Sequence, residues 1–169
     1  IALMKYADHV ITCTPDLNDF AKQYCANCTD ISSTLDTERL FPINKYTNDK
    51  PVVIGWTGTH STVPYLHLLD IVFQKLAKER TFKLRVIGNF QFQLNNVEFE
   101  YFDWNKEDEA AQLQGMDIGV YPLPTDAWVM GKSGLKALTY MTVGLPVVAT
   151  NVGAAINRVI AENENGFLV

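Results

Sequence analysis

The feature that most constrains the fold is an alternation of short apolar runs with helical patterns, which begins at Val52. The run 52–56 is apolar and ends in a Thr-Gly pair, and apolar residues at helical spacing follow it from Tyr65 to Leu76. The same alternation continues along the chain, with further strands predicted at 83–88, 97–101, 117–122, 146–150 and 167–169 and further helices at 106–114, 132–143 and 154–162. Near-continuous apolar strands separated by helices favour a parallel sheet that is covered on both faces. With right-handed crossovers, this pattern predicts a Rossmann-like, doubly wound α/β domain.

The N-terminal stretch follows a different pattern. Residues 6–12 predict the end of a helix that leads into a strand. Thr14 and Pro15 are typical of the cap and the first position of a second helix, which we expect to run to Tyr24.

A linker is predicted between these elements and the main domain. The stretch 40–50 is polar and irregular, and we place the domain boundary near Asn48. Residues 1–48 are then the end of a preceding domain with an interdomain linker, too small to bury a core of their own. Residues 49–169 form the main domain.

Charge, hydropathy and cysteine content exclude several classes of protein. The formal net charge of −5 gives no electrostatic reason to expect a nucleic-acid partner. No apolar run reaches the roughly 18–20 residues that a membrane-spanning helix needs. Three cysteines, an odd number, indicate a reducing compartment, and we expect a cytoplasmic protein. Cys25 and Cys28 form a CxxC pair, but no further ligands complete a zinc site, so a loop after a helix is the favoured interpretation.

Ligands of a doubly wound sheet bind beyond the carboxyl ends of its strands, and the loop 57–62 lies at such an end. Gly58 allows close approach of a ligand to the backbone, and a hydroxyl such as that of Ser61 at the start of a helix suits a phosphate. Helix capping by Ser61 or Thr62 explains the same residues about as well.

Lys132 and Lys136 are the strongest candidates for binding an anion. On a helix that spans 132–143 they would share a face near its N-terminus. Like charges at this spacing repel each other, and the helix dipole disfavours cations there. Both penalties vanish beside an anion, so we predict that the two lysines bind phosphate; a solvated basic face is the alternative.

Two tryptophans and one asparagine are further candidates for the ligand edge. Trp128 follows the strand at 117–122, and Trp104 follows the strand at 97–101; either could stack on a base or a sugar, although a core role is at least as common for tryptophan. Asn89 follows the strand at 83–88, where a turn residue is the more common interpretation. No nucleophile-elbow spacing supports a hydrolase.

These residues lie within segments that resemble a known family. The segments 117–124, 131–132, 136–141, 144–150 and 165–169 resemble the group 1 glycosyltransferases of family 4. Residues 54–58 and 65–66 resemble the opening of the same domain, so that the similarity covers roughly residues 50–169. The segments 7–11 and 35–41 resemble the stretch that joins the family's two domains.

The resemblance implies a GT-B architecture, in which two Rossmann-like domains face a cleft and the C-terminal one binds the nucleotide-sugar. It further implies transfer to a polysaccharide, glycolipid or other acceptor with retention of anomeric configuration and without a metal or other cofactor. The chain is then expected to hold the donor domain, to lack the N-terminal acceptor domain and the closing helices, and to be inactive alone. Peripheral association of the whole protein with the inner face of the membrane is compatible with this family.

Two departures from the family pattern affect the predicted site. Gly131 and Thr139 occupy the positions of the two usual glutamates, and Trp56, Thr57 and His60 stand where the first loop usually carries an arginine and a lysine. Our hypothesis is that Lys132 and Lys136 take over diphosphate stabilisation as the catalytic residues. The donor-binding residues predicted with them are Gly55, Thr57, Gly58, Ser61, Asn89, Trp104, Pro122, Trp128, Gly131, Ser133, Gly134 and Thr139.

Two alternatives remain open from the sequence. The missing glutamates are also compatible with a non-catalytic nucleotide- or sugar-binding module. A flavodoxin-like domain would need an acidic cluster or a flavin-binding loop at the strand ends, and neither is present.

Overall fold

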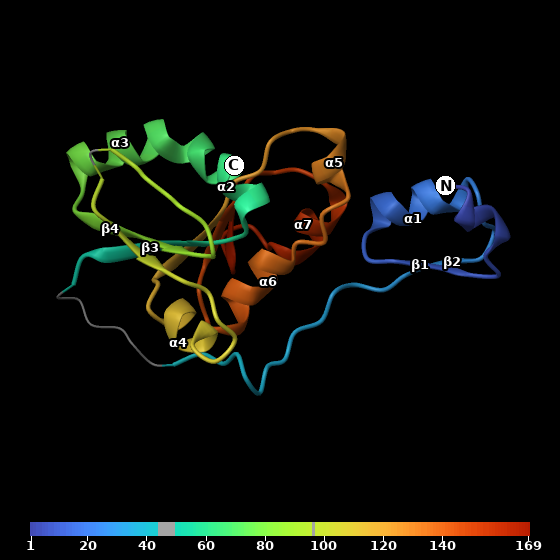
Figure 1. Ribbon diagram of the computed structural model, residues 1–169, viewed down its shortest axis with the longest axis horizontal. Helices are drawn as coiled ribbons and strands as arrows, with labels where there is room; N and C mark the ends of the chain where they lie inside the picture. Colours follow the sequence, from blue (N-terminus) through green and yellow to red (C-terminus); the bar gives the residue numbers. More distant parts are fainter. Residues whose placement is uncertain (44–49, 96) are drawn as a thin grey trace.

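The computed structural model describes residues 1–43, 50–95 and 97–169, and its main part is a six-stranded parallel sheet (Figure 1). The strand order is β5-β4-β3-β6-β7-β8, and every neighbouring pair is parallel. The predicted doubly wound α/β fold is therefore confirmed. The strands are β3 (Val52–Thr57), β4 (Phe82–Ile87), β5 (Phe99–Phe102), β6 (Ile118–Tyr121), β7 (Val147–Ala149) and β8 (Gly166–Leu168).

Helices cover both faces of this sheet. In Figure 1, α3 lies over one face, and α4 and α6 lie over the other. The side chains of the strands divide accordingly: Leu84 of β4 packs with Phe73 of α3, whereas Ile87 of the same strand packs in the cluster that contains Tyr140 of α6. The helices of this domain are η2 (His60–Thr62), α2 (Val63–Leu66), η3 (His67–Leu69), α3 (Asp70–Glu79), α4 (Glu109–Gln114), α5 (Ala127–Met130), α6 (Leu135–Thr142) and α7 (Ala154–Val159).

The helical pattern predicted from Tyr65 to Leu76 is divided in the structure. A 3-10 turn, η3, separates α2 from α3. At this turn the side chains of His67 and Asp70 contact each other, with Nδ1 and Oδ2 2.9 Å apart.

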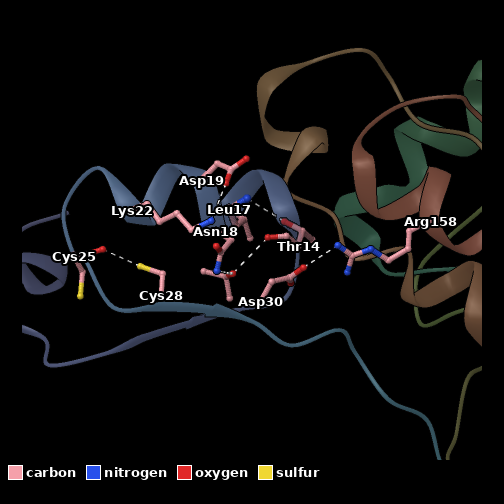
Figure 2. A network of polar contacts seen from close by, with 10 residues as sticks. Thr14, Leu17, Asn18, Asp19, Lys22, Cys25, Cys28, Asp30 and Arg158 are labelled. Carbon is pink, nitrogen blue, oxygen red and sulfur yellow. Dashed lines mark hydrogen bonds and ion pairs between the residues drawn. The ribbon is translucent and has the colours of Figure 1, made fainter.

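The N-terminal residues form a small unit with its own two-stranded parallel sheet. It comprises η1 (Leu3–Tyr6), β1 (Val10–Thr12), α1 (Pro15–Lys22) and β2 (Cys28–Asp30). The predicted cap is confirmed, because Thr14 Oγ1 accepts a hydrogen bond of 3.1 Å from Leu17 N (Figure 2). A two-stranded sheet is marginal on its own, which agrees with a unit that depends on its neighbours.

The CxxC pair lies where α1 leads into the second strand. Cys28 begins β2, so the expectation of a loop is wrong for this residue, and its Sγ donates to Cys25 O at 3.0 Å (Figure 2). The described residues form no group of three or more His, Cys, Asp and Glu side chains that could hold a metal ion.

Two polar contacts join the N-terminal unit to α7 of the main domain. Asp16 Oδ2 accepts a hydrogen bond of 3.1 Å from Ala154 N at the first residue of α7. Asp30 Oδ2 pairs with Arg158 Nη2 at 3.0 Å (Figure 2). Water and salt can compete for both of these contacts.

Breaking the second contact is expected to release the unit. In Arg158→Met, limited proteolysis between residues 31 and 34 should accelerate about two- to five-fold, the factor that matches a partly exposed ion pair. Lys22→Met is the matched control, because its partner Asp19 lies within the unit. Equal cleavage rates in the two variants would show that the Asp30–Arg158 pair does not hold the unit.

Part of the predicted linker packs against the main domain. Leu40 is only 1% exposed and lies in the core beneath the sheet. Arg39 Nη1 pairs with Glu109 Oε2 at 2.8 Å, and Gln114 Nε2 donates to Phe41 O at 2.8 Å, so the chain runs along α4. The expectation of an irregular polar linker is thus wrong at Leu40. The predicted boundary near Asn48 lies outside the described residues.

Candidate functional site

Two lysines and several aromatic side chains meet at the carboxyl edge of the sheet. They come from the ends of β3 and β6, the first helical turns after β3, the loop after α5 and the first turn of α6. Ligands bind at this edge in doubly wound folds. We call this group the lysine–aromatic cluster; its members are Trp56, Thr62, Tyr65, Tyr121, Lys132 and Lys136.

Lys136 is the most enclosed cation of the cluster. Its Nζ lies 4.7 Å from the centroid of the Trp56 ring and 5.7 Å from that of Tyr121. It also lies 3.4 Å from Thr62 Oγ1, a long hydrogen bond. Burial, with a smaller contribution from the charge of Lys132, lowers the pKa of Lys136 to about 8.

Lys132 lies in a loop, which corrects the helical spacing predicted for the two lysines. α6 begins at Leu135, because Gly134 before it has a left-handed φ of 73° and interrupts the helix predicted from residue 132. The argument from a shared helix face is therefore wrong. The lysines are nevertheless brought together, since Lys132 contributes to the lowered pKa of Lys136 and its Nζ lies 5.5 Å from the Tyr65 ring centroid.

The positive charge of the cluster has no acidic partner within the described part of the chain. The ion pairs of these residues are formed by other side chains, and none includes Lys132 or Lys136. Two neighbouring ammonium groups without a carboxylate form a site whose charge favours an anion.

Tyr140 fixes α6 to the sheet beneath the cluster. Its hydroxyl accepts a hydrogen bond of 2.9 Å from Thr57 N and donates one of 3.4 Å to Val120 O. Tyr140 is fully buried, and its ring lies against Gly119 of β6, where a side chain would collide with it. These contacts set the position of the helix that carries Lys136.

The loop after β3 is shaped by packing and capping. A Cβ on Gly58 would lie 2.2 Å from the Trp56 ring, so this glycine makes room for the indole. Thr59 and Thr62 form a capping box at the start of η2, which supports the capping interpretation of Thr62. Ser61 is exposed, with its Oγ 3.0 Å from Thr59 Oγ1.

Two of the predicted donor-binding residues lie inside regular elements. Gly55 is in the middle of β3, where a Cβ would collide with the side chain of Met116. Thr139 is buried in α6, and its Oγ1 donates to Leu135 O at 2.9 Å. Both residues have structural partners of their own.

Three others lie on loops or short helices outside the cluster. Trp104 is half exposed and donates from Nε1 to Glu109 Oε1 at 3.0 Å. Trp128, on the unpredicted helix α5, is 78% exposed, and Asn89 is exposed after β4. Within the described ranges, the contacts that define the cluster involve none of them.

The remaining predicted residues border the cluster along the chain. Pro122 is buried directly after Tyr121. Gly131 ends α5 and faces Leu17 of the N-terminal unit, since a Cβ there would lie 3.2 Å from Leu17 Cδ2. Ser133 and Gly134 connect Lys132 to α6.

Sequence reasoning did not select the aromatic members of the cluster. The sequence pattern places Tyr65 in a helix and Trp56 and Tyr121 in strands, and Trp56 also departs from the family pattern. Their positions at the carboxyl ends of predicted strands, or one turn beyond, were the available signal. Only the fold shows that their rings face the lysines.

The fold is a parallel Rossmann-like sheet, and the cationic cluster lies at the edge where ligands bind in doubly wound folds. The sequence profile of the family described as Glycosyl transferases group 1 matches residues 51–169. The chain belongs to this family, as the resemblance predicts.

Solved glycosyltransferases have the same fold. TarM, known from S. aureus, is 16% identical with a TM-score of 0.75, over 99% of this chain and 35% of TarM. A glycosyltransferase from Rickettsia africae ESF-5 is 16% identical with a TM-score of 0.73, over 99% of this chain and 52% of that one. The lipopolysaccharide outer core galactosyltransferase WaaB is 16% identical with a TM-score of 0.62, over 97% and 49%. The fold is thus the Rossmann-like half of a GT-B glycosyltransferase.

The extent of these matches limits what they establish. The chain spans about a third to a half of the length of these solved structures. No curated protein matches the sequence significantly. None of the helices in the described ranges combines the length and apolar character needed to cross a bilayer.

Proposed function

We propose that the lysine–aromatic cluster binds the diphosphate of a nucleotide-sugar, and that the whole protein transfers the sugar with retention of configuration. The observation that carries this proposal is the pair of ammonium groups without an acidic partner at the ligand edge of a family fold. The departing nucleoside diphosphate gains negative charge in the transition state, and stabilising that charge is the main electrostatic task of the reaction.

Lys132 and Lys136 divide this task. Lys136 is fixed by α6 and lies deepest, where low polarity strengthens its interaction with a phosphate. Lys132 is carried by a loop and supplies the second charge. Together they supply the positive charge that a divalent cation supplies elsewhere, so the reaction needs no metal.

Membership of the family supports the remaining parts of this proposal. The acceptor is a polysaccharide, a glycolipid or another acceptor, held by an N-terminal acceptor domain. The reaction takes place in the cytoplasm, where the whole protein is able to associate with the inner face of the membrane. The lipopolysaccharide substrate named for WaaB belongs to that protein; here it supports only the class of acceptor.

A second candidate function is a nucleotide- or sugar-binding module without catalysis. It is favoured by the two positions where the family's glutamates usually stand. Gly131 faces Leu17, and Thr139 Oγ1 is bonded to its own helix, so neither position offers a carboxylate to the donor.

The first test is a calorimetric titration of the protein with UDP-, GDP- and ADP-sugars. Selective binding is expected, and a ligand of the folded state raises stability by about 2.7 kcal/mol at a hundred times its dissociation constant. Lys132→Ala should weaken binding at least tenfold, whereas Lys78→Ala on the exposed side of α3 should have no effect. Equal affinity in both variants would exclude the cluster as the donor site.

Sugar transfer by the whole protein separates the two candidate functions. The enzyme loses transfer when Lys132 and Lys136 are both replaced by alanine. A binding module retains nucleotide affinity but transfers no sugar in its wild-type form. Wild-type transfer in the double variant would contradict the assigned roles.

A further inference from the structure

Lys136 occupies an unusual position for a charged side chain. Its ammonium group lies over the faces of two aromatic rings, 4.7 Å from the Trp56 centroid and 5.7 Å from the Tyr121 centroid. Both distances are within the range of cation–π attraction. No ion pair of the described residues compensates its charge, so the two rings and the long contact with Thr62 are its stabilising partners.

The Trp56 ring is held rigidly in the orientation that faces Lys136. The residue is 0% exposed and belongs to β3, which pairs with β4 on one side and β6 on the other. Phe90 packs edge-on against the indole at a centroid distance of 5.8 Å, and the absence of a Cβ at Gly58 leaves room for it. The ring therefore offers a fixed aromatic face.

Tyr121 contributes its ring, because its hydroxyl stays protonated at neutral pH. Burial, with a smaller contribution from Tyr65, raises the pKa of Tyr121 to about 12. A phenolate that could neutralise Lys136 is thus not formed. The attraction between these two residues comes from the ring face.

We propose that Trp56 and Tyr121 are positioning residues, which keep the Lys136 ammonium charged and directed toward the phosphate while leaving it free of a competing anion. This inference rests on the proposed function. A carboxylate would also stabilise a buried ammonium, but it would compete with the phosphate for the same charge. Aromatic rings attract the cation without occupying the anion site.

The test measures the pKa of Lys136 directly by ¹⁵N NMR of the lysine side chains in the ligand-free protein, with Lys136→Met assigning the signal. Trp56→Leu and Tyr121→Leu remove a ring and keep an apolar side chain, whereas Trp56→Phe and Tyr121→Phe retain a ring. The leucine variants should lower the pKa of Lys136 by about one, and the phenylalanine variants should change it little. The dispersion of the amide spectrum identifies any variant that fails to fold. If the variants at Trp56 or at Tyr121 fail to fold, the pKa of Lys136 in the variants at the other position tests the proposal.

Pyrophosphate binding at pH 7 provides the second readout. The leucine variants should weaken it about three- to tenfold, with the phenylalanine variants close to the wild type. An unchanged or raised pKa in folded leucine variants overturns the positioning role, whatever the protein binds. A wild-type protein that binds neither pyrophosphate nor a nucleotide-sugar overturns the proposed function, whatever the pKa.

Discussion

Replacing Lys136 with methionine is expected to raise the free energy of unfolding at pH 7 by about 2–3 kcal/mol while removing the affinity for pyrophosphate. The folded protein bears the cost of burying this ammonium, since burial lowers its pKa from 10.5 to about 8. Methionine fills the space without a charge and packs well against aromatic rings. A residue that stabilises a departing phosphate would thus destabilise the free protein.

The stability advantage of Lys136→Met over the wild type is expected to depend on pH. Below pH 8, Lys136 is protonated in the folded and the unfolded state, and the whole cost is present. Between pH 8 and 10.5 the folded state releases the proton and the unfolded state keeps it, so the wild type gains stability as the pH rises. The advantage of Lys136→Met is therefore largest below pH 8 and shrinks through this window.

Urea denaturation at pH 7 and at pH 9.5 measures both effects. Lys75→Met is the matched control, because Lys75 is exposed on α3 and its replacement should change stability little at either pH. A Lys136→Met variant that is less stable than the wild type at pH 7, or that keeps the same advantage at pH 9.5, would contradict a buried and charged Lys136.

Gly119→Ala is expected to lower the free energy of unfolding by about 3 kcal/mol. A Cβ at this position would lie 2.4 Å from Cδ2 and 2.5 Å from Cγ of Tyr140. The ring has no free space to move into, since Tyr140 is fully buried and its hydroxyl is bonded to Thr57 N and Val120 O. Relief of the collision displaces α6, so Lys136 moves and pyrophosphate affinity falls as well.

A double-mutant cycle identifies the collision as the cause. In the background of Tyr140→Leu, which removes the ring, Gly119→Ala should cost less than about 1 kcal/mol. Gly131→Ala is the control. A Cβ at Gly131 would also contact a neighbour, but that neighbour is the end of the flexible Leu17 side chain, which can adjust. If the effects of Gly119→Ala and Tyr140→Leu on the free energy of unfolding were additive, the destabilisation would not come from the collision with Tyr140 but from elsewhere in β6.

The fold was predictable because its signal is local. An apolar run such as 52–56 indicates a parallel strand that is buried on both faces, and the helical periodicity after it indicates the helix that follows. Both signals lie within a few residues of the chain. The cap at Thr14 was predictable for the same reason, since its hydroxyl bonds to a backbone group three residues away. The limits of the helices were less predictable. α6 starts three residues after the predicted residue 132, because the conformation of Gly134, and not apolar spacing, sets its beginning.

The sequence by itself determined the order of the elements, the ligand edge, the family and the choice of Lys132 and Lys136 as candidates. The tertiary structure decided what surrounds them. Trp56 and Tyr121 are far apart along the chain, and parallel pairing of β3 with β6 brings their rings to one ammonium group. No local sequence pattern predicts the contact of these two rings with Lys136, because its energy depends on where the ends of separate strands lie in space.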